Sequence, residues 1–319
     1  MKAIVTGNAG FIGSHLTERL LGAGVEVLGI DGITEYYDKR IKRRNLSAAL
    51  SHPSFEFIEG DILQSQKLKK TIGEAEWIFH IAAQPGVRPS WGTSFEDYTR
   101  NNVLATQHLL ELSRESRRLR RFIYASSSSV YGQTGTEKVA ETNPTAPYSP
   151  YGVTKLAGEH LCSLYASNFG IPVASFRFFT VYGPRQRPDM AFNRLLTAAL
   201  TGKAFQLFGD GSQERDFTYV SDVIDGLMLA ATNENCRGVF NIGGGHVISL
   251  NEVIALLQDI MGTTVSVKRT EAQKGDVQRT SADTTLIQQT LGYSPKVDIR
   301  QGIKNELEFI KEHLTLTDV

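Results

Sequence analysis

This sequence of 319 residues has only two cysteines, no long apolar run and no excess of one charge. Its only cysteines, Cys162 and Cys236, lie far apart and form no C-x-x-C pair, which argues against a disulfide framework or a cysteine metal site. We therefore predict two buried thiols in a reducing compartment and no metal centre. No apolar run approaches the roughly 18 residues of a membrane-spanning helix, so no membrane partner is expected.

The charges balance: lysine plus arginine and aspartate plus glutamate both number 34. Nucleic-acid-binding domains usually carry a basic excess, so we expect no nucleic-acid partner. Two basic clusters, at residues 39–44 and 117–121, contain no interleaved aromatics that could stack on bases, and we predict that both face solvent. Because the first residues run straight into a glycine turn, too soon for a signal-peptide core, we expect a cytoplasmic protein.

Short runs rich in β-branched residues alternate with helical patterns from the first residue. Strands are expected at residues 3–5, 25–30, 55–58, 76–80, 121–125 and 172–176, and helices at 12–21, 64–72, 95–116 and 151–168. This alternation predicts an α/β protein with a doubly wound parallel (Rossmann) sheet. Glycines and prolines interrupt it after about residue 180. We predict one domain at residues 1–180, to which residues 222–243 return, and a smaller C-terminal α/β lobe at 181–319.

The stretch Thr6–Gly13 follows the first expected strand and opens the first expected helix. Its glycines would let the backbone turn tightly and approach a pyrophosphate, and the helix N-terminus offers free N–H groups to the phosphates. A glycine triplet alone is weak evidence, but its place between a strand and a helix predicts a dinucleotide site in the first domain. The residues assigned to this turn are Gly7, Gly10, Phe11, Ile12 and Gly13.

Asp31 ends the second expected strand. A carboxylate there can accept hydrogen bonds from an adenosine ribose and would repel a 2′-phosphate, so NAD is the expected cofactor and not NADP. The alternative is an aspartate that only caps a turn. NAD is also expected to lie beside Asp61 and Ile62, which follow the third strand, and beside Ala82 and Ala83, which follow the fourth.

Tyr151 and Lys155 stand four residues apart in an expected helix, so their side chains share one face, with Cβ atoms about 5–6 Å apart. A lysine ammonium so placed favours the phenolate; lowering a phenol pKa from about 10 to near 7 needs roughly 4 kcal/mol. Such a phenol can take a hydroxyl proton while hydride leaves the same carbon. Serines 126–129 end the fifth strand, where their hydroxyls either meet the reacting oxygen or belong to a polar loop.

Together these motifs resemble the extended short-chain dehydrogenase/reductases that modify nucleotide sugars, over essentially the whole chain. The resemblance rests on the glycine turn, the serines followed by Val130-Tyr131-Gly132, the Tyr151/Lys155 pair, and Gly209-Asp210-Gly211 leading to Arg215-Asp216-Phe217. Within that family, residues 36–38, 82–88 and 177–190 are most similar to UDP-glucuronate 4-epimerases.

The resemblance implies roles for individual residues. Tyr151 would be the catalytic base, Lys155 its partner, and Ser127 the hydroxyl beside the sugar 4-OH. Ser126, Asn102 and Lys155 would hold NAD. The implied substrate-binding residues are Ser128, Ser129, Arg88, Thr180, Arg187, Arg215, Asp276 and Arg279. Gln273 stands where relatives acting on neutral sugars often carry an arginine, which leaves the number of diphosphate contacts open. The family also implies a homodimer formed through the helices near residues 95–116 and 151–168.

These relatives can all begin by oxidising C4 of the sugar. Those that eliminate water carry Asp and Glu at the positions of Ser128 and Ser129, and serine has no useful acid-base capacity near neutral pH. We therefore predict 4-epimerisation through a 4-keto sugar. Arg187 can bind a carboxylate through two parallel hydrogen bonds, so UDP-glucuronate is the predicted substrate. A 4-epimerase of UDP-glucose or UDP-N-acetylglucosamine, and more remotely a non-catalytic dinucleotide sensor, stay open.

Overall fold

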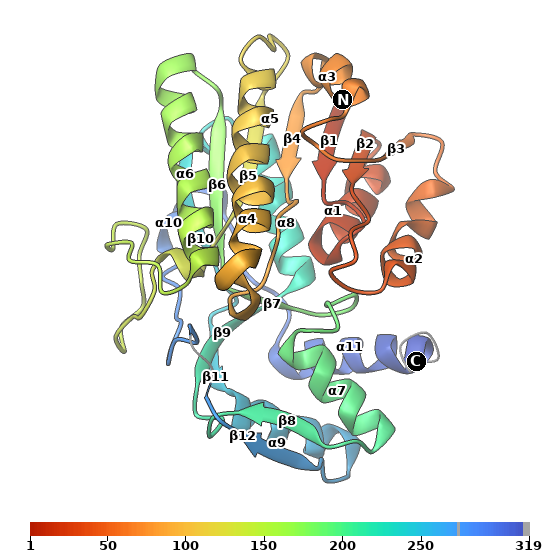
Figure 1. The fold of residues 1–319 in the computed structure, drawn as a ribbon, viewed down its shortest axis with the longest axis vertical. Coiled ribbons are helices and arrows are strands. Elements are labelled where there is room, and N and C mark those ends of the chain that lie inside the picture. The colour runs from red at the N-terminus through yellow and green to blue at the C-terminus, as the bar shows by residue number, and fades with distance from the viewer. Residues whose placement is uncertain (273–274, 315–319) are drawn as a thin grey trace.

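The computed structural model describes residues 1–272 and 275–314 (Figure 1). Seven strands form its main sheet in the order β10-β6-β5-β4-β1-β2-β3, and every neighbouring pair is parallel. Their bounds are β1 Lys2–Thr6, β2 Glu26–Asp31, β3 Phe55–Glu59, β4 Trp77–His80, β5 Arg121–Ser127, β6 Val173–Phe178 and β10 Gly238–Ile242. The predicted doubly wound sheet is confirmed. Its order reverses between β1 and β4, where such sheets bind ligands.

Helices cover both faces of this sheet. On one face Ile4 and Ile78 pack with Leu109, and on the other Val5 and Phe79 pack with Leu16. The strands are therefore apolar on both sides, which is why they read as β-branched runs. The first face carries α3 (Gln66–Thr71), α5 (Ala105–Ser113) and α6 (Pro150–Phe169), and the second carries α1 (Phe11–Gly22), α2 (Lys39–Leu50) and α8 (Val220–Thr232).

The helix expected at residues 95–116 is built from three pieces. The short α4 (Phe95–Tyr98) continues through a π-helical segment, Thr99–Leu104, into α5. Wider turns of this kind are rare in proteins and often occur at functional sites. Here the segment carries the buried Asn102.

Beyond the carboxyl ends of the main sheet lie two smaller sheets (Figure 1). One has the order β11-β9-β7 and the other pairs β12 with β8. The strands are β7 Thr180–Tyr182, β8 Phe205–Phe208, β9 Glu214–Tyr219, β11 His246–Ser249 and β12 Val267–Thr270, and the helices around them are α7 Ala191–Thr201, α9 Leu250–Met261, α10 Thr285–Leu291 and α11 Ile299–His313. Among the predicted site residues, Thr180 begins β7, Arg187 lies between β7 and α7, and Arg215 lies in β9.

The prediction that both basic clusters face solvent is wrong for Lys42 and Arg121. Lys42 is 6% exposed, and its ammonium lies 3.7 Å from the Asp31 carboxylate. Arg121 is 2% exposed and donates to the carbonyls of Asn233, at 2.6 Å, and Cys236. Asn233 is the residue that caps the C-terminal end of α8, where a positive charge interacts favourably with the helix dipole.

Two features of the composition, the cysteines and the apolar segments, can be examined in the structure. Cys162 and Cys236 are both buried and form no disulfide, as predicted. Across residues 1–272 and 275–314, no helix combines the length and the apolar character needed to cross a membrane.

Candidate active site

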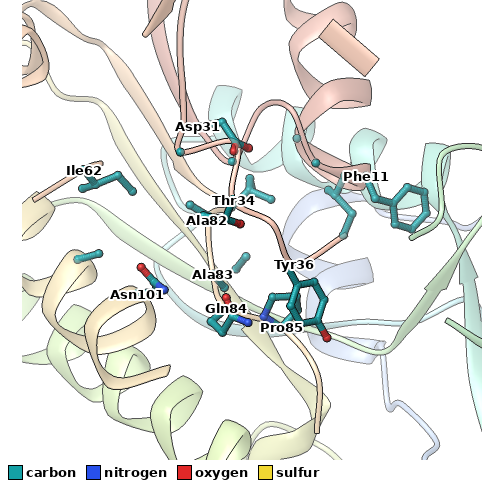
Figure 2. Close-up of a pocket in the computed structure, with 18 of the residues that line it drawn as sticks. Phe11, Asp31, Thr34, Tyr36, Ile62, Ala82, Ala83, Gln84, Pro85 and Asn101 are labelled. Atoms are coloured by element: carbon teal, nitrogen blue, oxygen red, sulfur yellow. The ribbon is translucent and has the colours of Figure 1, made fainter. Parts of the chain in front are cut away.

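A cavity of about 610 Å³ opens at the carboxyl ends of β1, β2, β4 and β5. It is lined by the glycine turn, the ends of these strands and the start of α6, and Figure 2 shows part of this wall. The predicted site residues that line it are Gly7, Gly10, Phe11, Ile12, Gly13, Asp31, Asp61, Ile62, Ala82, Ala83, Ser126, Tyr151, Lys155 and Arg187. Segments distant in the sequence thus line one cavity.

The glycine turn is too tight for side chains. A Cβ on Gly7, whose φ is +71°, would lie 2.8 Å from the backbone of Ala82, and a Cβ on Gly13 would lie 2.2 Å from the Gly7 carbonyl oxygen. Helix α1 begins directly after Gly10, which has no side chain to cap it. Its first N–H groups are therefore left for a ligand, and the turn fits the pyrophosphate of a dinucleotide.

Asp31 both shapes a turn and borders the cavity. Its carboxylate accepts hydrogen bonds from the backbone N–H of Ile33 at 2.8 Å and of Ala9 at 3.3 Å. Lys42, which also lines the cavity, lies beside it and donates to the Thr34 hydroxyl at 3.1 Å. The two interpretations of Asp31, turn cap and cofactor ligand, are therefore compatible in one residue.

Asn102 lies behind the cavity wall. Its side-chain oxygen accepts from the Gln84 N–H at 2.7 Å, and its amide donates to the Gln84 carbonyl at 3.1 Å and to the Thr154 hydroxyl at 2.9 Å. These bonds hold the segment after β4 against α6. The neighbouring Asn101 and Gln84 face the cavity in its place.

Tyr151 reaches the cavity because α6 begins very close to the serine-rich end of β5. A Cβ on Gly152 would lie 2.6 Å from the Ser129 carbonyl oxygen, so only glycine permits this approach. The Ser127 hydroxyl accepts from the Ser129 N–H at 3.1 Å and caps the short turn Ser128–Val130. Ser127, Ser128, Ser129 and Thr180 stand just outside the residues that line the cavity.

Burial dominates the electrostatics of the Tyr151/Lys155 pair. It raises the pKa of the Tyr151 phenol, while a hydrogen bond with Ser127 and the charge of Arg187 act in the opposite direction. Burial also lowers the pKa of Lys155 to about 7. The Lys155 ammonium lies 4.9 Å from the centre of the Tyr124 ring. Both groups are therefore held where a nearby charge can change their protonation.

Ser126 leads from the cavity into a buried ion pair that the sequence did not indicate. Its hydroxyl donates to Glu159 at 2.8 Å, and Glu159 is paired through both carboxylate oxygens with Arg177. All three side chains are buried. This network fixes the end of β5 against α6 and β6, and thus the place of the serines beside Tyr151.

At the other end of the cavity, Arg187 lies near two tyrosines. Its guanidinium carbon is 5.8 Å from the centre of the Tyr36 ring, and its charge influences the pKa of Tyr151. The same guanidinium forms two hydrogen bonds with Asp189, at 3.0 and 2.9 Å. The arginine predicted to bind a carboxylate does so here, with a carboxylate of the chain itself.

Four further predicted substrate residues, Arg88, Arg215, Asp276 and Arg279, do not line this cavity. Arg88 forms an ion pair with Asp276 at 2.6 Å. Burial lowers the pKa of Arg215, Asp276 opposes this shift, and the charge of Arg88 adds to it. Arg279 pairs instead with Glu214. Gln273 lies outside the described residues.

Several residues at the site were not predicted from the sequence. Arg194 and Phe208 are two of them: Arg194 and the predicted Arg88 both lie over the Phe208 ring, at 5.3 and 4.2 Å from its centre, and none of the three lines the main cavity. Tyr36 belongs to residues 36–38, which indicated the family but predicted no role for an individual residue. The other cavity residues without a prediction are Ile30, Gly32, Thr34, Tyr37, Lys42, Glu59, Gly60, Ile81, Gln84, Pro85, Asn101, Ala105, Ala125 and Phe178. Half of them come from loops, where spacing carries no information about direction. The others lie near strand ends, as Ile30, Glu59, Ala125 and Phe178 do, or on helical segments, as Lys42, Asn101 and Ala105 do.

Comparison with known proteins bears on this arrangement. The model of the NAD dependent epimerase/dehydratase family matches residues 3–243. A protein of Bacillus subtilis (strain 168), named as an uncharacterized UDP-glucose epimerase, YtcB, is 43% identical over 312 residues, which are 97% of this chain and 98% of that protein. The UDP-glucuronate 4-epimerase of Thermodesulfobacterium geofontis (strain OPF15) is 34% identical over 317 residues, 98% and 97% of the two chains.

A solved structure is similar along the whole chain. It is the UDP-glucuronic acid 4-epimerase of Bacillus cereus in complex with UDP-glucuronic acid and NAD. The TM-score is 0.95 at 42% identity, and the match covers 98% of this chain and 100% of that one.

Proposed function

The chain belongs to the NAD dependent epimerase/dehydratase family, and on this basis we propose that it is a UDP-glucuronate 4-epimerase that forms UDP-galacturonate. One observation carries the proposal: Tyr151, the candidate base, and Arg187, the candidate carboxylate ligand, line the same cavity as the glycine turn. The similarity to the Bacillus cereus UDP-glucuronic acid 4-epimerase supports it.

The cofactor in this proposal is NAD, which supplies a hydride acceptor and donor at its nicotinamide ring. The glycine turn and the N-terminus of α1 would hold its pyrophosphate, and Asp31 its adenosine ribose. Ala82 and Ala83 leave room for it beside β4. In this division residues 1–180 and 222–243 form the NAD-binding domain, and residues 181–319 form the lobe that binds the nucleotide sugar.

Tyr151 moves the proton in the proposed reaction. Its phenolate takes the proton of the sugar 4-OH as C4 is oxidised, and the Ser127 hydroxyl, which already interacts with Tyr151, binds the same oxygen. Lys155, on the same helix face, would favour the phenolate when it is protonated, and burial places its pKa at about 7. After the 4-keto sugar has rotated, Tyr151 returns the proton to the oxygen, now on the opposite side of the ring.

Arg187 would control the fate of the sugar carboxylate. Oxidation of glucuronate at C4 gives a β-keto acid, which loses CO2 when its carboxylate aligns with the carbonyl π-system. Two parallel hydrogen bonds from a guanidinium fix the carboxylate plane and prevent this alignment. Ser128, Ser129 and Thr180, close by, would add weaker hydrogen bonds.

The arginines between the two parts of the molecule would bind the UDP moiety. Arg88 and Arg194 provide two positive charges over Phe208, and the charges of Arg215 and Asp276 lie close to Arg88. A diphosphate is the ligand that such a group of arginines suits, since guanidinium groups pair with phosphate oxygens. The Phe208 ring offers an apolar face to a base. Arg279, with Glu214, would border the nucleotide.

A second candidate is a 4-epimerase of UDP-glucose or UDP-N-acetylglucosamine. Asp189 already neutralises Arg187, so the sugar end of the cavity carries no net charge from this pair. A neutral sugar would meet no unbalanced charge there. The name of the Bacillus subtilis relative points the same way.

The proposal includes a cytoplasmic homodimer. Helix α6 exposes Val153, Leu164 and Phe169 by 37% or more of their surface, and the adjoining segment exposes Trp91, Phe95 and Leu104 in the same way. Exposed apolar residues gathered on neighbouring helices indicate a protein interface. Sedimentation analysis should show a dimer, and Leu164→Asp should shift it towards monomer; a monomeric wild type would contradict this part of the proposal.

The deciding experiment is proton NMR of the purified protein with UDP-glucuronate and UDP-glucose in parallel, with no NAD added. We expect UDP-galacturonate to form from UDP-glucuronate, because NAD is regenerated in every cycle and copurifies. After removal of NAD, activity should return with NAD and not with NADP. Preference for UDP-glucose would replace the first candidate with the second.

A further inference from the structure

Arg187 and Asp189 form a closed pair in the turn between β7 and α7. The Nε of Arg187 donates to one Asp189 carboxylate oxygen at 3.0 Å and its Nη2 donates to the other at 2.9 Å. The Arg187 side chain is 20% exposed and that of Asp189 is 41% exposed. Asp189 therefore contacts Arg187 on the side of the guanidinium that is closer to solvent.

A guanidinium is planar and carries five N–H groups. Asp189 uses one on Nε and one on Nη2, along a single edge. Of the other three, two point out along the Nη1–Nη2 end, and the guanidinium also has a hydrogen bond with the Tyr36 side chain. Because the group is rigid, a partner fixed along one edge also fixes the direction of the other. An arginine held in this way can bind a second carboxylate, but only from that end.

We propose that Asp189 is a positioning residue that holds Arg187 so that its Nη1–Nη2 end is presented to the carboxylate of the sugar. This inference rests on the proposed function. Tyr36 supports the same guanidinium through its ring. The Tyr36 hydroxyl is in turn held close to Gly86, where an added Cβ would lie 2.6 Å from it.

The turn itself is fixed by contacts that do not involve Asp189. Arg185 pairs with Glu18 of α1 at 2.8 Å, and the Pro184 carbonyl lies 2.8 Å from a ring nitrogen of His15. The Gln186 side chain bonds the Val181 carbonyl and the Asn193 N–H. Replacing Asp189 should therefore free the guanidinium without releasing the backbone.

The Arg187–Asp189 pair affects the orientation of the sugar carboxylate more than the affinity for UDP-glucuronate. With Asp189 in place the pair has no net charge, so a sugar carboxylate is recognised through directed hydrogen bonds. Asp189→Asn would leave the positive charge of Arg187 in the cavity. One of the two carboxylate oxygens that accept hydrogen bonds from Arg187 would be replaced by an amide NH2, which is a donor. Binding of UDP-glucuronate should then persist, while the plane of its carboxylate is no longer fixed.

The test compares wild type, Asp189→Asn and Asp259→Asn as NAD-loaded enzymes. Asp259 pairs with Arg300 on the surface at 2.6 Å and serves as the control. With UDP-glucuronate, Asp189→Asn should lower kcat by about ten-fold or more, the scale of a charged hydrogen bond, and raise the fraction of decarboxylated UDP-4-keto-pentose. KM should stay the same or fall, and turnover of UDP-glucose should be unchanged. A KM that rises equally for both sugars, or wild-type kcat and product ratio, would overturn the inference.

A second measurement tests the positioning role of Asp189 without relying on enzyme activity. The Nε–H group of Arg187, assigned in 15N NMR spectra with Arg187→Lys, should be protected from solvent exchange in wild type and should lose this protection in Asp189→Asn. Equal protection in both proteins contradicts the positioning role. If wild type turns over no UDP-glucuronate, the proposed function fails, whereas this signal still reports on Asp189.

Discussion

The two ends of the main cavity are built in different ways. The dinucleotide end is made largely of backbone: Gly7 and Gly13 lie so close to their neighbours that neither has room for a Cβ. The sugar end is made of side chains, with Tyr36, Tyr151 and Arg187 brought in from three separate segments. A backbone cradle is encoded within a few consecutive residues, whereas a cluster of side chains exists only once the chain has folded.

This difference has functional consequences. Phosphates are common to all dinucleotides, so N–H groups at the start of a helix suffice to bind them. Discrimination between sugars needs charges and hydrogen-bonding groups at defined positions, and one altered side chain can change it. We therefore expect substitutions at the sugar end to change catalysis, and those at the dinucleotide end to change stability or cofactor retention.

Tyr151→Phe should have the largest effect. It removes the oxygen that carries the proton and keeps the ring, so turnover should fall by roughly 10²–10⁴-fold, as for other lost general bases. The NAD content of the purified variant, measured after denaturation, should equal that of wild type. Turnover near the wild-type level would show that another group is the base.

Arg187→Ala tests the sugar end directly. Loss of one partner of a buried charge pair typically costs about 2–5 kcal/mol, so turnover of UDP-glucuronate should drop by roughly 30- to 5,000-fold. Mass spectrometry should also detect decarboxylated product. Arg300→Ala, which removes a surface arginine, is the matched control. Unchanged turnover in Arg187→Ala would refute the acidic-sugar proposal.

A pair of glycine variants tests the dinucleotide end. An alanine Cβ at position 13 would lie 2.2 Å from the Gly7 carbonyl oxygen, but one at position 10 would lie 3.2 Å from it. Gly13→Ala should lower stability by about 1–3 kcal/mol, as overpacking does. Gly10→Ala should change stability less and mainly reduce NAD retention. Equal unfolding free energies in urea would mean that the turn can relax around a Cβ.

An effect that depends on pH, and does not act on the cavity directly, is expected at Glu306, which is 1% exposed in α11 and accepts a hydrogen bond from the Gly183 N–H at 2.8 Å. Burial raises the pKa of its carboxyl well above the usual value. A raised carboxyl pKa contributes stability that is present below the unfolded pKa and is lost as pH rises towards the folded pKa.

The free energy of unfolding of Glu306→Gln should therefore increase relative to that of wild type as pH rises above about 4.3, by at most roughly 1.4 kcal/mol per pH unit. Urea unfolding of both proteins at pH 5 and pH 7.5 measures this difference. A stability difference that is the same at the two pH values would show that Glu306 titrates normally.

The sequence predicted the strands of the main sheet and most of its helices, but it did not predict helix α2. Apolar runs predicted six of the strands, since a strand buried on both faces has no other pattern. Helix α2 was missed because its basic residues suggested a solvent-exposed segment, although Ile41, Leu46 and Ala49 are buried along it. Lys42 turns inward from the same helix to pair with Asp31.

By itself, the sequence determined the local geometry of this protein: the alternation of strands and helices, the glycine turn, and the spacing of Tyr151 and Lys155 on one helix face. Each depends on neighbours in the chain, whose φ/ψ limits and side-chain periods are fixed by residue type. Only the tertiary structure decided that Arg187 lies in the same cavity as Tyr151, that Asp189 holds it, and that Arg88 meets Asp276 across 188 positions. Such contacts depend on how whole elements pack, because a long side chain in a loop takes its direction from the surfaces that surround it.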